Sequence, residues 1–187
     1  LRWAQTFIEV QHIQSNELFR STQFDNIFDT GIKLQMNPAE VINGGLDFSY
    51  VHRIARHDLV MGRETQYGGH LNLKPVSRFL WENSFNYARS DDIGNGQRLF
   101  SGYIARSRFN LQLSREWSVR LVLQYNDFTH NWDADPLLTW RLNPFSIFYV
   151  GSTRNYAEFD LDPQMQDDQW RLMNRTYFLK LQYLFQL

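Results

Sequence analysis

The last eleven residues of the chain, 177–187, alternate between two kinds of side chain. One face is entirely apolar or aromatic: Tyr177, Leu179, Leu181, Tyr183, Phe185 and Leu187. The other face is half polar, with Lys180, Gln182 and Gln186 on it. Because successive side chains of a strand point to opposite sides of a sheet, this period of two predicts a β-strand with two unlike faces. The strand is predicted to run to the final residue, although the ends of soluble domains usually fray into water. A membrane barrel, whose last strand faces lipid, fits this pattern better.

The composition limits the other possibilities. The 187 residues include no cysteine, which excludes disulfides, thiolate metal sites and cysteine nucleophiles. No run of 18 apolar residues occurs, so a transmembrane helix is not expected. Aromatic residues make up 16% of the chain, an excess that suits aromatic girdles at two membrane interfaces. The net charge is −1, which gives no electrostatic support for a nucleic-acid partner.

Alternating segments separated by polar or Gly/Pro-containing breaks fill the rest of the chain. They predict about ten strands, each long enough to cross a bilayer when tilted. The short connections are predicted at 37–40, 74–77, 114–117 and 143–145. The longer ones are predicted at 15–23, 54–66, 91–97, 129–135 and 157–169. Short periplasmic turns and longer external loops are typical of outer-membrane barrels, so we expect an all-β, antiparallel transmembrane β-barrel. A soluble sandwich or a lipocalin-like barrel is the alternative.

The chain opens inside an apparent strand, without an initiator Met or a signal peptide. An exported protein needs such a signal. We therefore expect residues 1–187 to be the C-terminal portion of a larger outer-membrane barrel, with earlier strands and an N-terminal module outside this sequence.

Three segments resemble one known family: SREWSVRLVLQYNDF (114–128), DADPLLTWRLNPFSIFYVG (133–151) and NRTYFLKLQYLFQL (174–187). They are similar to the closing strands of large Gram-negative outer-membrane proteins that carry an N-terminal, family-nine-like carbohydrate-binding module ahead of the barrel. The resemblance implies an association with glycans, but the module itself is outside this chain and no sugar-binding residue is carried over. The matched positions are scaffold residues by the family's logic: Leu137, Leu138, Trp140, Asn143, Pro144, Tyr149, Gly151, Lys180, Tyr183 and Phe185.

Charged residues are unevenly distributed over the predicted inner face of the barrel. Acidic residues fall on the earlier strands: Asp25, Asp29, Asp47 and Glu82. Basic residues fall on the later strands: Arg106, Arg108, Arg120 and Arg141. An acidic wall opposite a basic wall would orient polar solutes in a pore. The alternative is a narrow barrel filled and closed by salt bridges.

The apolar face of 177–187 has a second interpretation besides contact with outer-membrane lipid. A terminal strand of this pattern is what a barrel assembly machinery would engage by adding it to an open strand edge. Removal of 185–187 is therefore expected to stall insertion.

Two further sites were considered on predicted loops. The acidic loop 160–168 offers oxygen ligands suited to Ca²⁺, but it lacks the spacing of an EF-hand and is expected to be a solvated loop, so no metal or cofactor is predicted. His57-Asp58 and His130, near Asp133 and Asp135, would suit a barrel-borne surface hydrolase, the least favoured alternative.

The sequence thus predicts a protein of the cell outer membrane that forms the wall of a porin-like pore or of a binding protein for glycans or similar solutes. A structural platform that docks other outer-membrane proteins is the main alternative.

Overall fold

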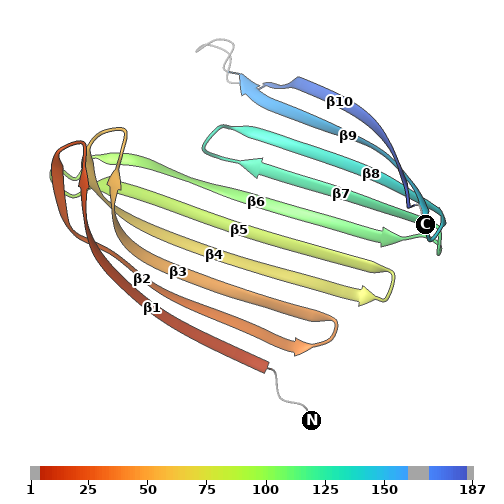
Figure 1. Ribbon diagram of the computed structural model, residues 1–187, viewed down its shortest axis with the longest axis horizontal. Coiled ribbons are helices and arrows are strands. Elements are labelled where there is room, and N and C mark those ends of the chain that lie inside the picture. The colour runs from red at the N-terminus through yellow and green to blue at the C-terminus, as the bar shows by residue number, and fades with distance from the viewer. Residues whose placement is uncertain (1–4, 160–168, 185–187) are drawn as a thin grey trace. The chain divides into compact units, whose positions relative to one another are not determined.

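The computed structural model describes residues 5–159 and 169–184 (Figure 1). All secondary structure in these residues is β. The ten strands are β1 (Gln5–Phe19), β2 (Thr22–Ala39), β3 (Ile42–Ala55), β4 (Val60–Val76), β5 (Phe79–Asp92), β6 (Arg98–Gln112), β7 (Trp117–Asn126), β8 (Asn131–Asn143), β9 (Ser146–Phe159) and β10 (Gln169–Tyr183). The described part of the chain contains no helix long and apolar enough to span a membrane.

The strands form one antiparallel sheet in chain order, β1 to β10, so that each strand pairs with its sequence neighbour (Figure 1). This confirms the predicted all-β class and the count of about ten strands. Within the described residues the sheet is open, because β1 pairs only with β2 and β10 pairs only with β9.

The sheet divides into two compact units. Unit 1 comprises Leu1–Leu71 and Ser84–Tyr103, and unit 2 comprises Asn72–Asn83 and Ile104–Leu187. Strands β1 to β3 therefore belong wholly to unit 1, and β7 to β10 belong wholly to unit 2.

The connections are shorter than the sequence predicts. The predicted loop at 15–23 is a two-residue turn, Arg20-Ser21, in which both residues have positive φ (47° and 65°). Such a left-handed pair matches the twist of the strands it joins. The predicted loops at 54–66 and 129–135 shrink to 56–59 and 127–130. The predicted strict alternation of short and long connections is therefore wrong. Polar residues at the strand ends stay paired with the neighbouring strand instead of forming loops.

The second Asn-Pro turn forms where it is predicted. Asn143 ends β8, and its side-chain Oδ1 accepts a hydrogen bond from the backbone N–H of Phe145 at 2.9 Å. This side-chain hydrogen bond closes the turn in the way that a backbone hydrogen bond would. Asn initiates turns readily for this reason. The first pair, Asn37-Pro38, lies inside the end of β2, and the chain turns at 40–41 instead.

The two faces of the sheet differ sharply in unit 2. On β7 and β8 one face carries apolar residues, and it is called the apolar face here: Val119, Leu121, Leu123, Ala134, Pro136 and Leu138. The residues between them point to the other side, called the polar face, which also carries two apolar residues: Ser118, Arg120, Val122, Gln124, Asp133, Asp135, Leu137 and Thr139. The ladder continues this division to β10, where Leu179 lies opposite Val150 on the apolar face and Lys180 lies opposite Tyr149 on the polar face.

Unit 1 repeats the division on its first three strands. Val10, Ile32 and Phe48 are successive cross-strand partners on the apolar face. Glu9, Lys33 and Asp47 occupy the corresponding places on the polar face. Large apolar side chains of the apolar face are highly exposed, as Val10 at 70% and Leu179 at 74% illustrate.

Neither unit has a hydrophobic core of the usual size. Among the described residues, the buried hydrophobic side chains are Phe24, Val51, Ile54 and Val122. A water-soluble domain stabilised by burial would hide most of its large apolar side chains. In this chain many of them are exposed instead, and most of the exposed ones lie on one face of their strands.

Candidate functional site

The polar face of unit 2 is organised around an ion pair between neighbouring strands. Arg108 of β6 donates from Nε to Oε2 of Glu82 on β5 at 2.5 Å, and its Nη2 contacts Oε1, so the pairing is bidentate. Asn110 Nδ2 donates a further hydrogen bond to Oε2 of Glu82 at 2.9 Å. Glu82 is thus fully engaged by its neighbours, and its charge is compensated locally.

Beside this pair the polar face is hollowed. A depression of about 490 Å³ lies over β4 to β9 in unit 2. Its volume falls within the range of roughly 300–1,000 Å³ that is common for small-molecule sites. Its polar lining residues include Lys74, Arg78, Asn110, Arg120, Thr139 and Tyr149.

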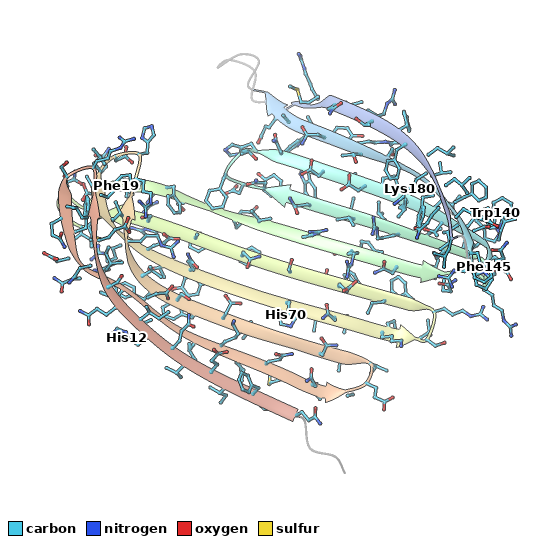
Figure 2. The ribbon with its side chains drawn as sticks, in the orientation of Figure 1. His12, Phe19, His70, Trp140, Phe145 and Lys180 are labelled. Carbon is cyan, nitrogen blue, oxygen red and sulfur yellow. The ribbon has the colours of Figure 1, made fainter. Side chains whose placement is uncertain are left out.

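The lining is basic and rich in hydrogen-bonding groups. Lys74, Arg78 and Arg120 are the charged residues that line the depression, and no carboxylate lines it within the described residues. Ser118, Thr139 and Gln112 add hydroxyl and amide groups to the lining. Lys180 of β10 adds a further positive charge, with Nζ 5.8 Å from the ring centroid of Tyr149 (Figure 2). The arrangement offers donors and positive charge to a polar or anionic solute.

Unit 1 has a smaller depression on its own polar face. It has a volume of about 150 Å³ and is lined by Glu9, Gln11, Lys33, Asp47 and Ser49, among other residues. Charges of alternating sign stand side by side here, because Lys33 lies between Glu9 and Asp47 in the ladder. Such opposite-charge cross-strand pairs stabilise a sheet.

A glycine accommodates one of these carboxylates. A Cβ added at Gly68 would lie 2.2 Å from Oδ2 of Asp47, so the carboxylate occupies the space above the glycine backbone. Further along β3 and β4, Arg53 Nε pairs with Oε2 of Glu64 at 3.3 Å, and the Glu64 side chain is only 6% exposed.

The structure brings most of the predicted inner-face charges to the polar face. Arg106, Arg108, Arg120 and Arg141 share it in unit 2, and Asp29 and Asp47 share it in unit 1. Glu82, predicted as part of an acidic wall, lies instead against Arg108 within unit 2. That these residues face a lumen remains a prediction.

Asp25 is placed differently from the sequence prediction, which assigned it to the face of Asp29. A bulge adds one residue to β2, since Ser15 pairs with Ile27 but Glu17 pairs with Phe24. The extra residue reverses the alternation beyond Asn26, whose φ is 58°. Phe24 consequently takes the face of Glu17 and is buried, whereas Asp25 is exposed.

Two rows of aromatic side chains border the apolar face of unit 2. The turn-side aromatic row consists of the successive cross-strand partners Trp117, Trp140 and Phe148, and the loop-side aromatic row of Tyr125, Trp132 and Tyr156. The rings of the turn-side row stack, with centroids 5.2 Å and 5.6 Å apart. Figure 2 shows Trp140 together with Phe145 at that end of the unit. The aromatic content of the chain predicts girdles but does not identify these residues. Their eight-residue spacing on β7, β8 and β9 is the signal that could have identified them.

The segment predicted to serve as an assembly signal lies on β10 as far as it is described. Tyr177, Leu179, Leu181 and Tyr183 share the apolar face and are 55–74% exposed. Phe185 and Leu187 lie outside the described residues. Recognition of this strand by an assembly machinery remains a prediction.

The residues considered for catalysis do not form a recognisable triad. Nδ1 of His57 lies 3.1 Å from Oδ1 of Asp58, and the His57 side chain is 98% exposed. His130 lies near Glu158, at 3.5 Å, rather than near the predicted aspartates. Asp133 accepts a hydrogen bond from Asn155 at 2.7 Å. The acidic loop 160–168 is outside the described residues, and the described ones contain no group of three or more His, Asp or Glu side chains placed to hold a metal ion.

Comparison with known sequences adds no further constraint. No protein-family model matches the chain, and no curated protein matches it significantly. The resemblance of residues 114–128, 133–151 and 174–187 to carbohydrate-associated outer-membrane barrels therefore stays an expectation.

Proposed function

We propose that this chain contributes to the wall of an outer-membrane β-barrel that binds or passes glycans or similar polar solutes. One observation carries the proposal: on β1 to β3 and on β7 to β10, most of the exposed apolar side chains lie on one face of the strands and most of the charges lie on the other. Transmembrane barrels alternate in this way, with apolar residues toward lipid and polar residues toward the lumen.

The two aromatic rows support the same proposal. On β7, Trp117 and Tyr125 are eight residues apart. At about 3.3 Å per residue they are separated by about 26 Å along the strand, which a tilt of roughly 40° reduces to about 20 Å. This separation approaches the apolar band of about 25 Å, bordered by aromatic girdles, that is typical of such barrels.

The basic depression on the polar face of unit 2 is the proposed solute site. Its hydroxyl, amide and cationic groups suit the hydroxyls and acidic substituents of a glycan. Tyr149 adds an aromatic surface with a polar tip.

The proposal is tested by recording single-channel currents from the full-length protein in planar bilayers, with a neutral oligosaccharide and a uronic-acid oligosaccharide as probes. We expect measurable conductance and a stronger block by the acidic probe. Arg120→Gln is expected to weaken that block, whereas Arg106→Gln, on the same face but outside the depression, serves as the matched control. Absence of conductance together with co-purification of other outer-membrane proteins would contradict the pore and favour a docking platform.

A further inference from the structure

Two arginines stand side by side on the apolar face of unit 2. Arg154 of β9 and Arg175 of β10 are direct cross-strand partners. The same register places Ser152 opposite Tyr177 and Val150 opposite Leu179, so both arginines share the face of the exposed Val150, Tyr177 and Leu179 and of the buried Ser152. Opposed like charges destabilise a strand pair unless something compensates them.

Nothing in the described part of the protein compensates this pair. Neither guanidinium has a carboxylate partner among the described residues, and Nε of Arg154 is buried without any hydrogen-bond partner. The described cross-strand neighbours of Arg154 are Ala134 and Arg175, which offer no side-chain acceptor. Arg175 lies against an aromatic ring, with Cζ 5.4 Å from the centroid of Tyr177. A buried donor without a partner is uncommon and calls for an acceptor outside the described residues.

The level of the pair along the strand indicates which acceptor this is. Arg154 lies two residues from Tyr156, a member of the loop-side aromatic row. At that level a membrane changes from hydrocarbon to head groups, and a cation on the lipid-facing side costs little there compared with the bilayer centre. In the proposed orientation, the end of β9 at Phe159 is the end that faces outward.

We propose that Arg154 and Arg175 form a binding site for the phosphate groups of a bisphosphorylated glycolipid in the outer leaflet. The inference rests on the proposed membrane orientation. Guanidinium groups match phosphate oxygens with paired hydrogen bonds, and an anion between the two would remove their mutual repulsion. Two adjacent cations favour a lipid that carries two phosphates over one with a single phosphodiester.

The test uses native mass spectrometry of the full-length protein in detergent micelles, with bisphosphorylated lipid A, its dephosphorylated form and phosphatidylglycerol as probes. We expect the protein to retain bisphosphorylated lipid A about tenfold more strongly than either other lipid, since charge-assisted hydrogen bonds are the strong ones. The double variant R154Q/R175Q is expected to lose that preference. Arg171→Gln is the matched control, because Arg171 lies on β10 opposite Ala157, on the other face of the strand.

Three outcomes would overturn the inference: equal retention of all three lipids, equal retention of phosphatidylglycerol and lipid A, or an unchanged preference in R154Q/R175Q. Heat-modifiable migration and far-UV circular dichroism show whether the double variant folds. If it does not, the singles R154K and R175K replace it, and they are expected to weaken retention because an ammonium cannot make the paired bonds. Absence of a lipid preference in the unsubstituted protein, when that protein still inserts into membranes, contradicts this site alone. Failure to insert contradicts the proposed function.

Discussion

Trp117 of β7 and Trp140 of β8 are cross-strand partners whose rings stack almost in parallel, with centroids 5.2 Å apart and planes at 5°. Both rings lie on the apolar face and remain more than a third exposed. In water such a pair would leave much apolar surface exposed to solvent. At a membrane interface the same rings lie where Trp is most favourable.

The stack should be measurable as a coupling energy. In a double-mutant cycle of W117L and W140L, we expect a coupling of about 0.5–1.5 kcal/mol in the free energy of unfolding from lipid vesicles. The matched control pairs W117L with W132L, since Trp132 lies in the other aromatic row, and this cycle should show additivity. Equal coupling in both cycles would mean that the ring contact itself contributes nothing.

The ion pair on the polar face predicts a second coupling. Glu82 and Arg108 are 24% and 41% exposed, so solvent screens their attraction and a coupling of about 1 kcal/mol is expected from E82Q, R108Q and the double variant in urea titrations. E82Q alone should cost more than R108Q, because it leaves the guanidinium of Arg108 without a charged partner and with one acceptor oxygen in place of two. A coupling near zero would contradict a structural role for the pair.

The ring of Phe178 is predicted to require glycine at position 151. A Cβ at this position would lie 2.5 Å from Cζ of Phe178, its partner on β10. Gly151→Ala is therefore expected to destabilise the protein by about 1–3 kcal/mol through overpacking. In the Phe178→Ala background the same substitution should cost much less. Similar costs in both backgrounds would show that the backbone, not the ring, demands glycine.

A carboxyl in the turn between β6 and β7 gives a prediction for pH dependence. Ser114 Oγ donates to Oε2 of Glu116 at 2.7 Å, and this bond, followed by the backbone N–H of Glu116, lowers the pKa of Glu116 below its ordinary value. A carboxyl with a lowered folded-state pKa stabilises the fold above its ordinary pKa, and the contribution is lost as the pH falls through the folded-state value.

The test is Ser114→Ala, which should raise the pKa of Glu116 toward its ordinary value in a ¹³C-carboxyl titration followed by NMR. The matched control is Ser118→Ala, which removes a hydroxyl from the start of β7 and should leave the titration unchanged. If S114A leaves the pKa of Glu116 where it was, the hydroxyl is not its cause.

Much of this fold follows from the periodicity of the sequence. The alternation in 117–126 and 177–183 predicts both the strands and their faces, because a period of two is a local property. Loop lengths do not follow in the same way. Asp133 and Asp135 look like loop residues in sequence, yet they pair with Gln124 and Val122 in the ladder and lie on the polar face.

The sites were less predictable, for a physical reason. One inserted residue at the bulge of β2 moves Asp25 off the face of Asp29, and no turn signal marks it. The pairing of Glu82 with Arg108 joins residues 26 positions apart and depends on register, which local pattern does not specify. The same holds for Arg154 and Arg175, whose adjacency appears only once β9 and β10 are paired.

The central claim is that the apolar face contacts lipid and the polar face contacts water. The chain lacks cysteine, so single cysteines can be introduced along β7 and labelled with nitroxides in the full-length protein in bilayers. Electron paramagnetic resonance then measures collisions with oxygen, which concentrates in lipid, and with a water-soluble nickel chelate. We expect high oxygen accessibility at 119, 121 and 123 and high nickel accessibility at 120 and 124, whereas 122 is omitted because Val122 is buried. Uniform accessibility to the nickel chelate along the strand would contradict it.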